Sequence, residues 1–144
     1  MRYGRPPNNP EARYRMGQAR VPAGLKVLLV EDNEMLAEAA AELLADMGCA
    51  AVHCATSAEA AMDWIDHGGE LDLLLTDVVM PGMNGVELAW HVREHRPELP
   101  VLLVSGYGDA LLVEQQRHFP MLSKPYRSEE MSRAIGGVIG VLAS

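Results

Sequence analysis

The chain has 144 residues, 49% of them hydrophobic, and a formal net charge of −8 at pH 7, which fits one domain with an ordinary buried core. It has no apolar stretch near the roughly 18 residues of a membrane span and no apolar signal segment, so we expect no membrane association. Its two cysteines, Cys49 and Cys54, match no metal-binding or redox spacing. We expect both to be small buried thiols in a protein of the reducing cytoplasm.

Charge is distributed unevenly along the chain. Residues 1–24 hold five arginines and one glutamate, a net charge of +4, so residues 25–144 carry −12. An acidic body of this size disfavours nucleic acid as a ligand. Residues 1–24 also hold four prolines and three glycines. We therefore predict a flexible basic extension over 1–24, either a leader or the end of a linker from a longer protein, and one folded domain over 25–144.

Short apolar runs bounded by turn residues predict five buried strands. They cover residues 26–30, 50–54, 71–76, 101–104 and 121–123.

Five amphipathic segments alternate with these strands. In the first, Asn33 is the expected N-cap, Gly48 ends the helix, and one apolar stripe consists of Leu36, Ala40, Leu43 and Met47. Ser57 caps the second helix. The helices are expected over 34–47, 57–66, 86–95 and 109–117 and in a final segment with its stripe at Met131, Ile135, Val138 and Leu142. This alternation predicts a doubly wound, five-stranded parallel α/β sheet with helices on both faces.

Polar residues follow four of the five strands at the point where each ends. They are Glu31 and Asp32 after the first strand, Asp77 after the third, Ser105 after the fourth and Lys124 after the fifth. Because the carboxyl ends of parallel strands share one edge, we expect these side chains to meet there. Taken singly, each has an ordinary explanation as a turn, cap or surface residue. Their recurrence at successive strand ends favours a common site.

The chain resembles the receiver domain of response regulators in two-component signalling, from about residue 25 to residue 142. The resemblance rests on the acidic pair Glu31-Asp32, on Asp77 within TDVVMPGMNG, on Ser105-Gly106 and on Lys124-Pro125. It implies a flavodoxin-like sheet with strand order 2-1-3-4-5. The wording VLLVSGYG and KPY is most similar to receivers of hybrid sensor kinases or to stand-alone regulators.

The resemblance implies a phosphoacceptor domain of a phosphorelay rather than an enzyme, with at most self-phosphorylation and autodephosphorylation. A histidine kinase or histidine phosphotransfer protein would donate a phosphoryl group to Asp77, which would switch a protein-interaction surface. Lys124 would neutralise the transferring group, and Ser105 would donate a hydrogen bond to it. Crowded carboxylates repel unless a cation joins them, so Mg²⁺ is the expected cofactor. Its implied ligands are Glu31, Asp32, Asp77 and the backbone carbonyl of Val79.

One departure from the family concerns the usual switch residue. Receivers usually carry Tyr or Phe three residues before the lysine, where this chain has Met121. Either Tyr107 or Tyr126 takes over that role, or the switch is muted. A muted switch favours an alternative function, a receiver-like interaction module that works without phosphorylation. A third interpretation, an aspartate-nucleophile phosphatase, needs an acid where the chain has Val79.

Glycines at 136, 137 and 140 are unusual in a helix, since each costs about 1 kcal/mol against alanine. They would allow close helix–helix approach, as in a homodimer or a docking face. Because the chain ends after its last helix, we expect no DNA-binding or enzymatic output domain.

Overall fold

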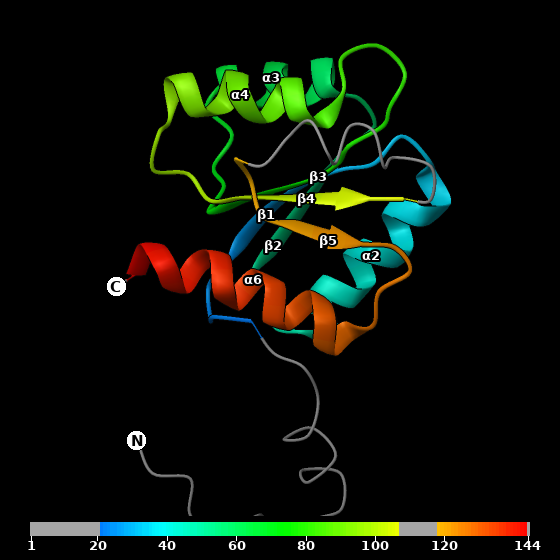
Figure 1. Cartoon of the computed structure of the whole chain (residues 1–144), viewed down its shortest axis with the longest axis vertical. Helices are drawn as coiled ribbons and strands as arrows, with labels where there is room; N and C mark the ends of the chain where they lie inside the picture. Colours follow the sequence, from blue (N-terminus) through cyan, green and yellow to red (C-terminus); the bar gives the residue numbers. More distant parts are fainter. Residues whose placement is uncertain (1–20, 107–117, 144) are drawn as a thin grey trace, which may run out of the picture.

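A single parallel sheet organises the fold (Figure 1). The computed structural model describes residues 21–106 and 118–143. The strands are β1 (Lys26–Val30), β2 (Ala51–Ala55), β3 (Leu73–Asp77), β4 (Val101–Ser105) and β5 (Met121–Ser123). Their spatial order is β2-β1-β3-β4-β5, and every neighbouring pair is parallel. The predicted fold class and strand order are therefore confirmed.

Helices cover both faces of the sheet. They are α2 (Glu34–Asp46), α3 (Ala58–Asp66), α4 (Gly85–His95) and α6 (Ser128–Ala143). Helices α3 and α4 lie over one face, and α2 and α6 lie over the other (Figure 1). In the part of the chain that the structure describes, no helix is both long and apolar enough to span a bilayer. The helix predicted over 109–117 lies outside the described residues, as does Tyr107.

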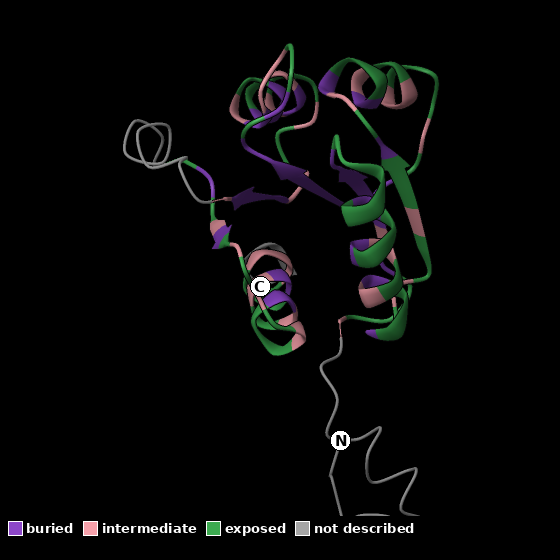
Figure 2. Ribbon diagram, turned by 90° about the vertical axis from the view of Figure 1, so that its right-hand side faces the viewer, coloured by how far each residue is buried: buried purple, intermediate pink, exposed green. Residues whose placement is uncertain are grey.

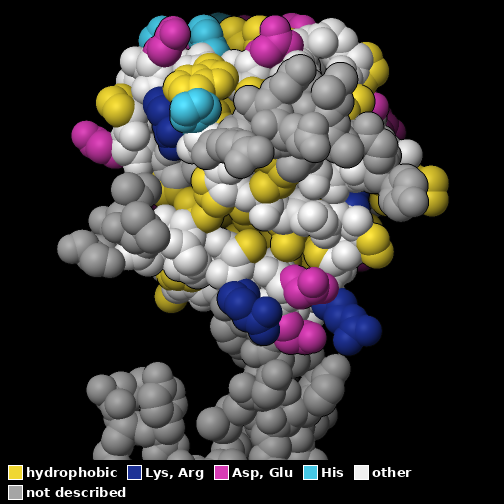
Figure 3. All heavy atoms as spheres, viewed as in Figure 1, with side chains coloured by type: hydrophobic (Ala, Val, Ile, Leu, Met, Phe, Trp, Pro, Cys, Tyr) yellow, Lys and Arg dark blue, Asp and Glu magenta, His cyan; other side chains and the backbone are white. Residues whose placement is uncertain are grey.

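The core consists of two apolar layers, one on each side of the sheet. Alternate side chains of β1 point to opposite faces: Leu28 packs with the layer under α3 and α4, and Leu29 packs with the layer under α2 and α6. Every residue of β3 and β4 is buried because both strands are central (Figure 2). Charged side chains lie mainly around the outer surfaces of the helical layers, with apolar side chains visible between the layers (Figure 3).

Side-chain caps begin three of the helices. Asn33 accepts a hydrogen bond from the Leu36 N–H at 3.1 Å, and Ser57 accepts one from the Ala60 N–H at 3.0 Å, so both predicted N-caps are confirmed. Helix α4 begins one residue earlier than predicted. Its cap, Asn84, forms a reciprocal capping box with Glu87.

The predicted apolar stripe of α2 is wrong in part. The side chain of Leu36 is 51% exposed, and the buried positions within the helix are Ala37, Ala40 and Leu44. The side of α2 that faces the sheet therefore differs from the predicted side. The helix carries more apolar positions than the sheet-facing side uses, so its apolar pattern did not identify that side.

The prediction of two buried cysteines is also wrong. Cys54 is exposed and Cys49 is half-buried, and both are free thiols. Cys54 lies on β2, the edge strand of the sheet, where three of five residues are exposed. An edge strand has fewer neighbours to cover it, so an apolar sequence there does not ensure burial.

The described chain begins inside the predicted basic extension. The Val21 N–H donates a hydrogen bond to the Met47 carbonyl at 2.9 Å, and the Val21 side chain packs against the α2/α6 layer. The division into 1–24 and 25–144 stays a prediction.

Candidate functional site

Three acidic side chains meet at the carboxyl edge of the sheet. Glu31 directly follows β1, and Asp77 is the last residue of β3. The register pairs Val30 with Thr76, so Glu31 and Asp77 occupy equivalent positions on neighbouring strands. One carboxylate oxygen each from Glu31, Asp32 and Asp77 lies within 4.8 Å of the others. Glu31 and Asp77 are buried and Asp32 is exposed, so the cluster reaches solvent on the Asp32 side.

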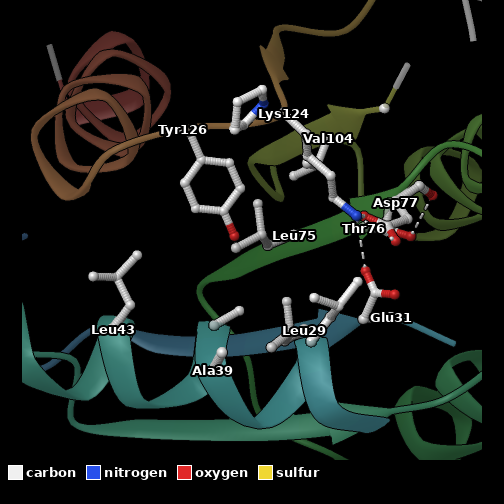
Figure 4. Close-up of a pocket in the computed structure, with 14 residues that line it drawn as sticks. Leu29, Glu31, Ala39, Leu43, Leu75, Thr76, Asp77, Val104, Lys124 and Tyr126 are labelled. Atoms are coloured by element: carbon white, nitrogen blue, oxygen red, sulfur yellow. Dashed lines mark hydrogen bonds and ion pairs between the residues drawn. The ribbon is translucent and has the colours of Figure 1, made fainter. Parts of the chain in front are cut away.

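Lys124 brings a positive charge to this cluster from the end of β5. Its Nζ lies 3.2 Å from Glu31 Oε2, 3.1 Å from Asp77 Oδ1 and 3.2 Å from Asp77 Oδ2 (Figure 4). The Lys124 N–H donates a hydrogen bond to the Ser105 carbonyl at 2.8 Å, which anchors the residue to β4. The Lys124–Pro125 peptide bond is cis. These distances show that both carboxylate oxygens of Asp77 contact the Lys124 ammonium group.

Burial and crowding make Asp77 hard to ionise. The pKa of Asp77 is raised to about 8: burial is the main cause, the neighbouring Glu31 carboxylate contributes in the same direction, and Lys124 acts against both. Burial also disfavours ionised Glu31, but hydrogen bonds with Asp77, the Asn33 N–H and Lys124 outweigh it and lower the Glu31 pKa. The pair therefore keeps a proton on Asp77 at neutral pH, because one lysine cannot balance the crowded carboxylates.

Burial lowers the pKa of Lys124, but Asp77 and Glu31 raise it by more, so the net shift is upward. The lysine is therefore charged throughout the physiological pH range. A cation bound next to Asp77 would add positive charge to the site and would favour the ionised form of the Asp77 carboxylate.

The loop after β3 is held close to Asp77 by a glycine. The Gly85 N–H donates a hydrogen bond to the Val78 carbonyl at 2.8 Å. A Cβ atom added at Gly85 would lie 1.9 Å from the Asp77 carbonyl oxygen. Only a glycine therefore allows the start of α4 to pack directly on the backbone of Asp77.

A second support for this loop comes from α3. Glu59 Oε2 accepts a hydrogen bond from the Met83 N–H at 3.1 Å. Gly82 has a positive φ of 78°, and its missing side chain leaves space that Glu59 approaches. Sequence reasoning missed Glu59, since its partner is 24 residues away and no local pattern links the two. The capping box at Asn84 did have a signal, an Asn followed three residues later by Glu.

Two expected site residues flank the acidic cluster. Ser105 is buried at the end of β4, one position beyond Val104, which pairs with Asp77. Val79 lies in the loop two residues after Asp77, with its side chain 52% exposed. Their roles as phosphoryl and metal ligands stay predictions.

Of the two tyrosines considered for the switch, the structure describes Tyr126. Its ring is half-buried and its hydroxyl points towards Leu75 and α2 (Figure 4). Met121, at the usual aromatic position, is partly buried against the α3/α4 layer. Burial raises the pKa of Tyr126, the nearby Lys124 lowers it, and Asp77 and Glu31 raise it further. The ring is thus electrostatically coupled to the acidic cluster.

A doubly wound parallel sheet with an acidic cluster and a lysine at its carboxyl edge defines the class of this protein. Residues 27–136 match the family described as response regulator receiver domain. The chain belongs to this family, and it is a phosphoacceptor domain of two-component signalling rather than a classical enzyme.

Curated relatives agree with this assignment. The chain is 37% identical over 109 residues to the response regulator protein FleR of Pseudomonas aeruginosa. The aligned region covers 74% of this chain and 23% of FleR. The chain is also 30% identical over 112 residues to the sensor kinase CckA of Brucella abortus. That aligned region covers 76% of this chain and 12% of CckA. The chain thus spans less than a quarter of either relative.

Solved structures agree as well. A response regulator receiver domain protein from Clostridium thermocellum is similar with a TM-score of 0.72 and 25% identity, covering 81% of this chain and 95% of that one. A response regulator receiver protein from Sinorhizobium medicae shares the fold with a TM-score of 0.74, at 22% identity and with 83% and 97% of the two chains covered.

Proposed function

We propose that Asp77 is the phosphoacceptor and that it takes its phosphoryl group from a phosphohistidine of a histidine kinase or phosphotransfer protein. The observation that carries this proposal is the convergence of three carboxylates on one site, with Lys124 Nζ 3.1 Å from Asp77. Asp77 is the member of the cluster that ends a central strand, which is where a nucleophile is held rigidly.

We also propose that this site holds Mg²⁺ through Glu31, Asp32, Asp77 and the backbone carbonyl of Val79. The donor set supports it: carboxylate oxygens suit a hard cation, and once Asp77 is ionised the three carboxylates against one lysine leave a charge of −2 for the cation to balance. When bound, Mg²⁺ supplies positive charge that stabilises the oxygens of a transferring phosphoryl group.

The other roles in the transfer belong to side chains of this protein. An ionised oxygen of Asp77 attacks phosphorus and forms an acyl phosphate, while the bond to the leaving group breaks. Lys124 stays charged and balances the phosphoryl oxygens, and the Ser105 hydroxyl donates a hydrogen bond to one of them. Slow self-phosphorylation by small donors and autodephosphorylation belong to the same site.

The direct test is intact-mass spectrometry after incubation with acetyl phosphate, with and without Mg²⁺. We expect a gain of one phosphoryl group that requires Mg²⁺ and is absent in Asp77→Asn. Asp72→Asn is a matched control, since Asp72 is exposed and lies before β3 rather than after it. Labelling that persists at one site in Asp77→Asn would exclude Asp77 as the acceptor.

A specific observation supports a second function, an interaction module that works without phosphorylation. Met121 replaces the aromatic residue that usually couples the phosphoryl group to the output surface, and it is already partly buried. Such a module would keep the fold and the surface for partners but would not need a cation.

Mg²⁺-dependent stability separates the two functions. At ten times its dissociation constant, Mg²⁺ is expected to stabilise the folded chain by about 1.4 kcal/mol, because it binds the assembled carboxylates and not the unfolded chain. Thermal unfolding with millimolar MgCl₂, against the same ionic strength of KCl, measures this. An unchanged melting temperature would favour the interaction module.

The proposal also includes a partner histidine kinase or phosphotransfer protein, a cytoplasmic location and a homodimer through α6. Size-exclusion chromatography with and without phosphoryl transfer measures the oligomeric state.

A further inference from the structure

Helix α3 begins at the same edge of the sheet as the acidic site. Strand β2 ends at Ala55, and Ser57 caps α3 two residues later. The Glu31 N–H donates a hydrogen bond to the Ala55 carbonyl at 3.0 Å. Helix α3 also packs beside α4 over one face of the sheet (Figure 1). The first turn of α3 therefore lies near both the acidic cluster and the loop that joins β3 to α4.

Glu59, in this first turn, contacts the loop at two neighbouring residues. Its Oε2 atom accepts the hydrogen bond from the Met83 N–H at 3.1 Å. A Cβ atom added at Gly82 would lie 2.9 Å from the same oxygen. The glycine thus allows the carboxylate to approach the backbone of the turn and also adopts the positive φ that the turn requires. One carboxylate oxygen of α3 therefore holds one defined turn of the loop.

The Glu59 carboxylate is itself held in place by backbone groups. The hydrogen bond from the Met83 N–H is the main cause that lowers its pKa, the N–H of Glu59 acts in the same direction, and burial acts against both. The start of a helix also favours negative charge. Glu59 is therefore ionised at neutral pH and oriented by its own helix.

The loop that Glu59 contacts contains Val79, whose backbone carbonyl is the proposed fourth ligand of Mg²⁺. One end of the loop is fixed by the hydrogen bond from the Gly85 N–H to the Val78 carbonyl and by the buried side chain of Met80. Its turn, at residues 81–82, is exposed and meets Glu59. A backbone carbonyl binds a cation only where its peptide group is held in a suitable orientation, so groups outside the ligand set influence affinity.

We propose that Glu59 is a positioning residue of the metal site: it holds the loop after β3 in the arrangement in which the Val79 carbonyl can bind Mg²⁺ beside Asp77. The inference rests on the proposed function of this site. Glu59 is not one of the three clustered carboxylates, so it acts through the loop backbone and not as a ligand.

Isothermal titration calorimetry of the full chain with MgCl₂ tests this role without a phosphodonor. Glu59→Ala removes the acceptor of the Met83 N–H, and we expect Mg²⁺ to bind about fivefold more weakly, the effect of one ordinary hydrogen bond. Glu59→Gln keeps a side-chain oxygen that accepts this hydrogen bond but loses the charge. Its dissociation constant should stay within about twofold of the wild type.

Asp66→Ala is the matched control, because it removes the same charge from the same helix. Asp66 is exposed at the last residue of α3, far along the helix from the first turn. Its variant should bind Mg²⁺ within about twofold of the wild type. Urea unfolding curves verify that all three variants are folded. Hydrogen exchange measured by NMR should be faster at the Met83 amide in Glu59→Ala than in Glu59→Gln.

The outcomes separate this inference from the proposed function. Wild-type affinity in Glu59→Ala would overturn the role of Glu59 and leave the metal site in place. Glu59→Gln or Asp66→Ala as weak as Glu59→Ala would also overturn it, because charge and not the hydrogen bond would then set the affinity. A wild-type chain that binds no Mg²⁺ would contradict both the proposed metal site and this inference.

Discussion

Replacing Gly85 with alanine is expected to unfold the acidic site and to destabilise the protein by more than about 3 kcal/mol. The added Cβ would lie 1.9 Å from the carbonyl oxygen and 2.8 Å from the carbonyl carbon of Asp77, and 3.1 Å from the Val78 Cα. All three atoms belong to the backbone, so no side-chain rotation relieves the clash. Either α4 or the end of β3 must move, and Asp77 moves with the latter.

Urea unfolding and labelling by acetyl phosphate together measure the effect of Gly85→Ala. We expect a lower unfolding midpoint and no labelling. Gly136→Ala is the matched control, because nothing lies within 4 Å of a Cβ added at this exposed helical glycine. It should stabilise the protein by about 1 kcal/mol, since alanine favours the helix. Wild-type stability of Gly85→Ala would show that the backbone contact is not tight in solution.

The second large effect is expected for Asp77→Asn, which should abolish labelling in the presence of Mg²⁺ and should remove a pH dependence of stability in its absence. The pKa of Asp77 is about 8 in the folded protein and about 4 in an unfolded chain. Between these values the folded state keeps a proton that the unfolded state has lost, so raising the pH destabilises the fold. One pKa unit corresponds to about 1.4 kcal/mol, so the expected loss amounts to a few kcal/mol.

Two neighbours of Asp77, Glu31 and Lys124, affect stability outside the range from pH 5 to pH 8. The lowered pKa of Glu31 affects stability only as the pH falls below about 4.5, and the raised pKa of Lys124 acts above 10.5. Urea unfolding in EDTA at pH 5, 6.5 and 8 should therefore show falling stability for the wild type and a flatter profile for Asp77→Asn. Asp46→Asn, at the exposed end of α2, should keep the wild-type profile. Parallel profiles for Asp77→Asn and the wild type would contradict the raised pKa.

Local sequence patterns determined the positions of the elements. Apolar runs predicted the five strands to within two residues at each end, because a central strand such as β4 must be apolar on both faces. Asn33 and Ser57 predicted where two helices begin, because their side chains satisfy N–H groups only a few residues away. Contacts of this range depend on neighbouring residues alone.

The residues of the site could be predicted from the sequence for a different reason. Parallel strands end at one edge, so polar residues after β1, β3 and β5 had to approach one another once the alternation of strands and helices was recognised. Strand order itself came from the family resemblance and not from any periodicity. The distances between Lys124 and the two buried carboxylates, and the raised pKa of Asp77, required the assembled sheet.

The sequence by itself thus determined the elements, their alternation and the strand ends that carry polar residues. The tertiary structure alone decided which side of α2 faces the core, that Cys54 is exposed on an edge strand, and that a cavity opens beside Asp77. It also decided the contacts of Glu59 with Met83 and of Gly85 with Asp77. The physical reason is range: hydrophobic periodicity and capping act over a few residues, whereas burial, cavities and backbone clashes depend on segments that meet only after folding.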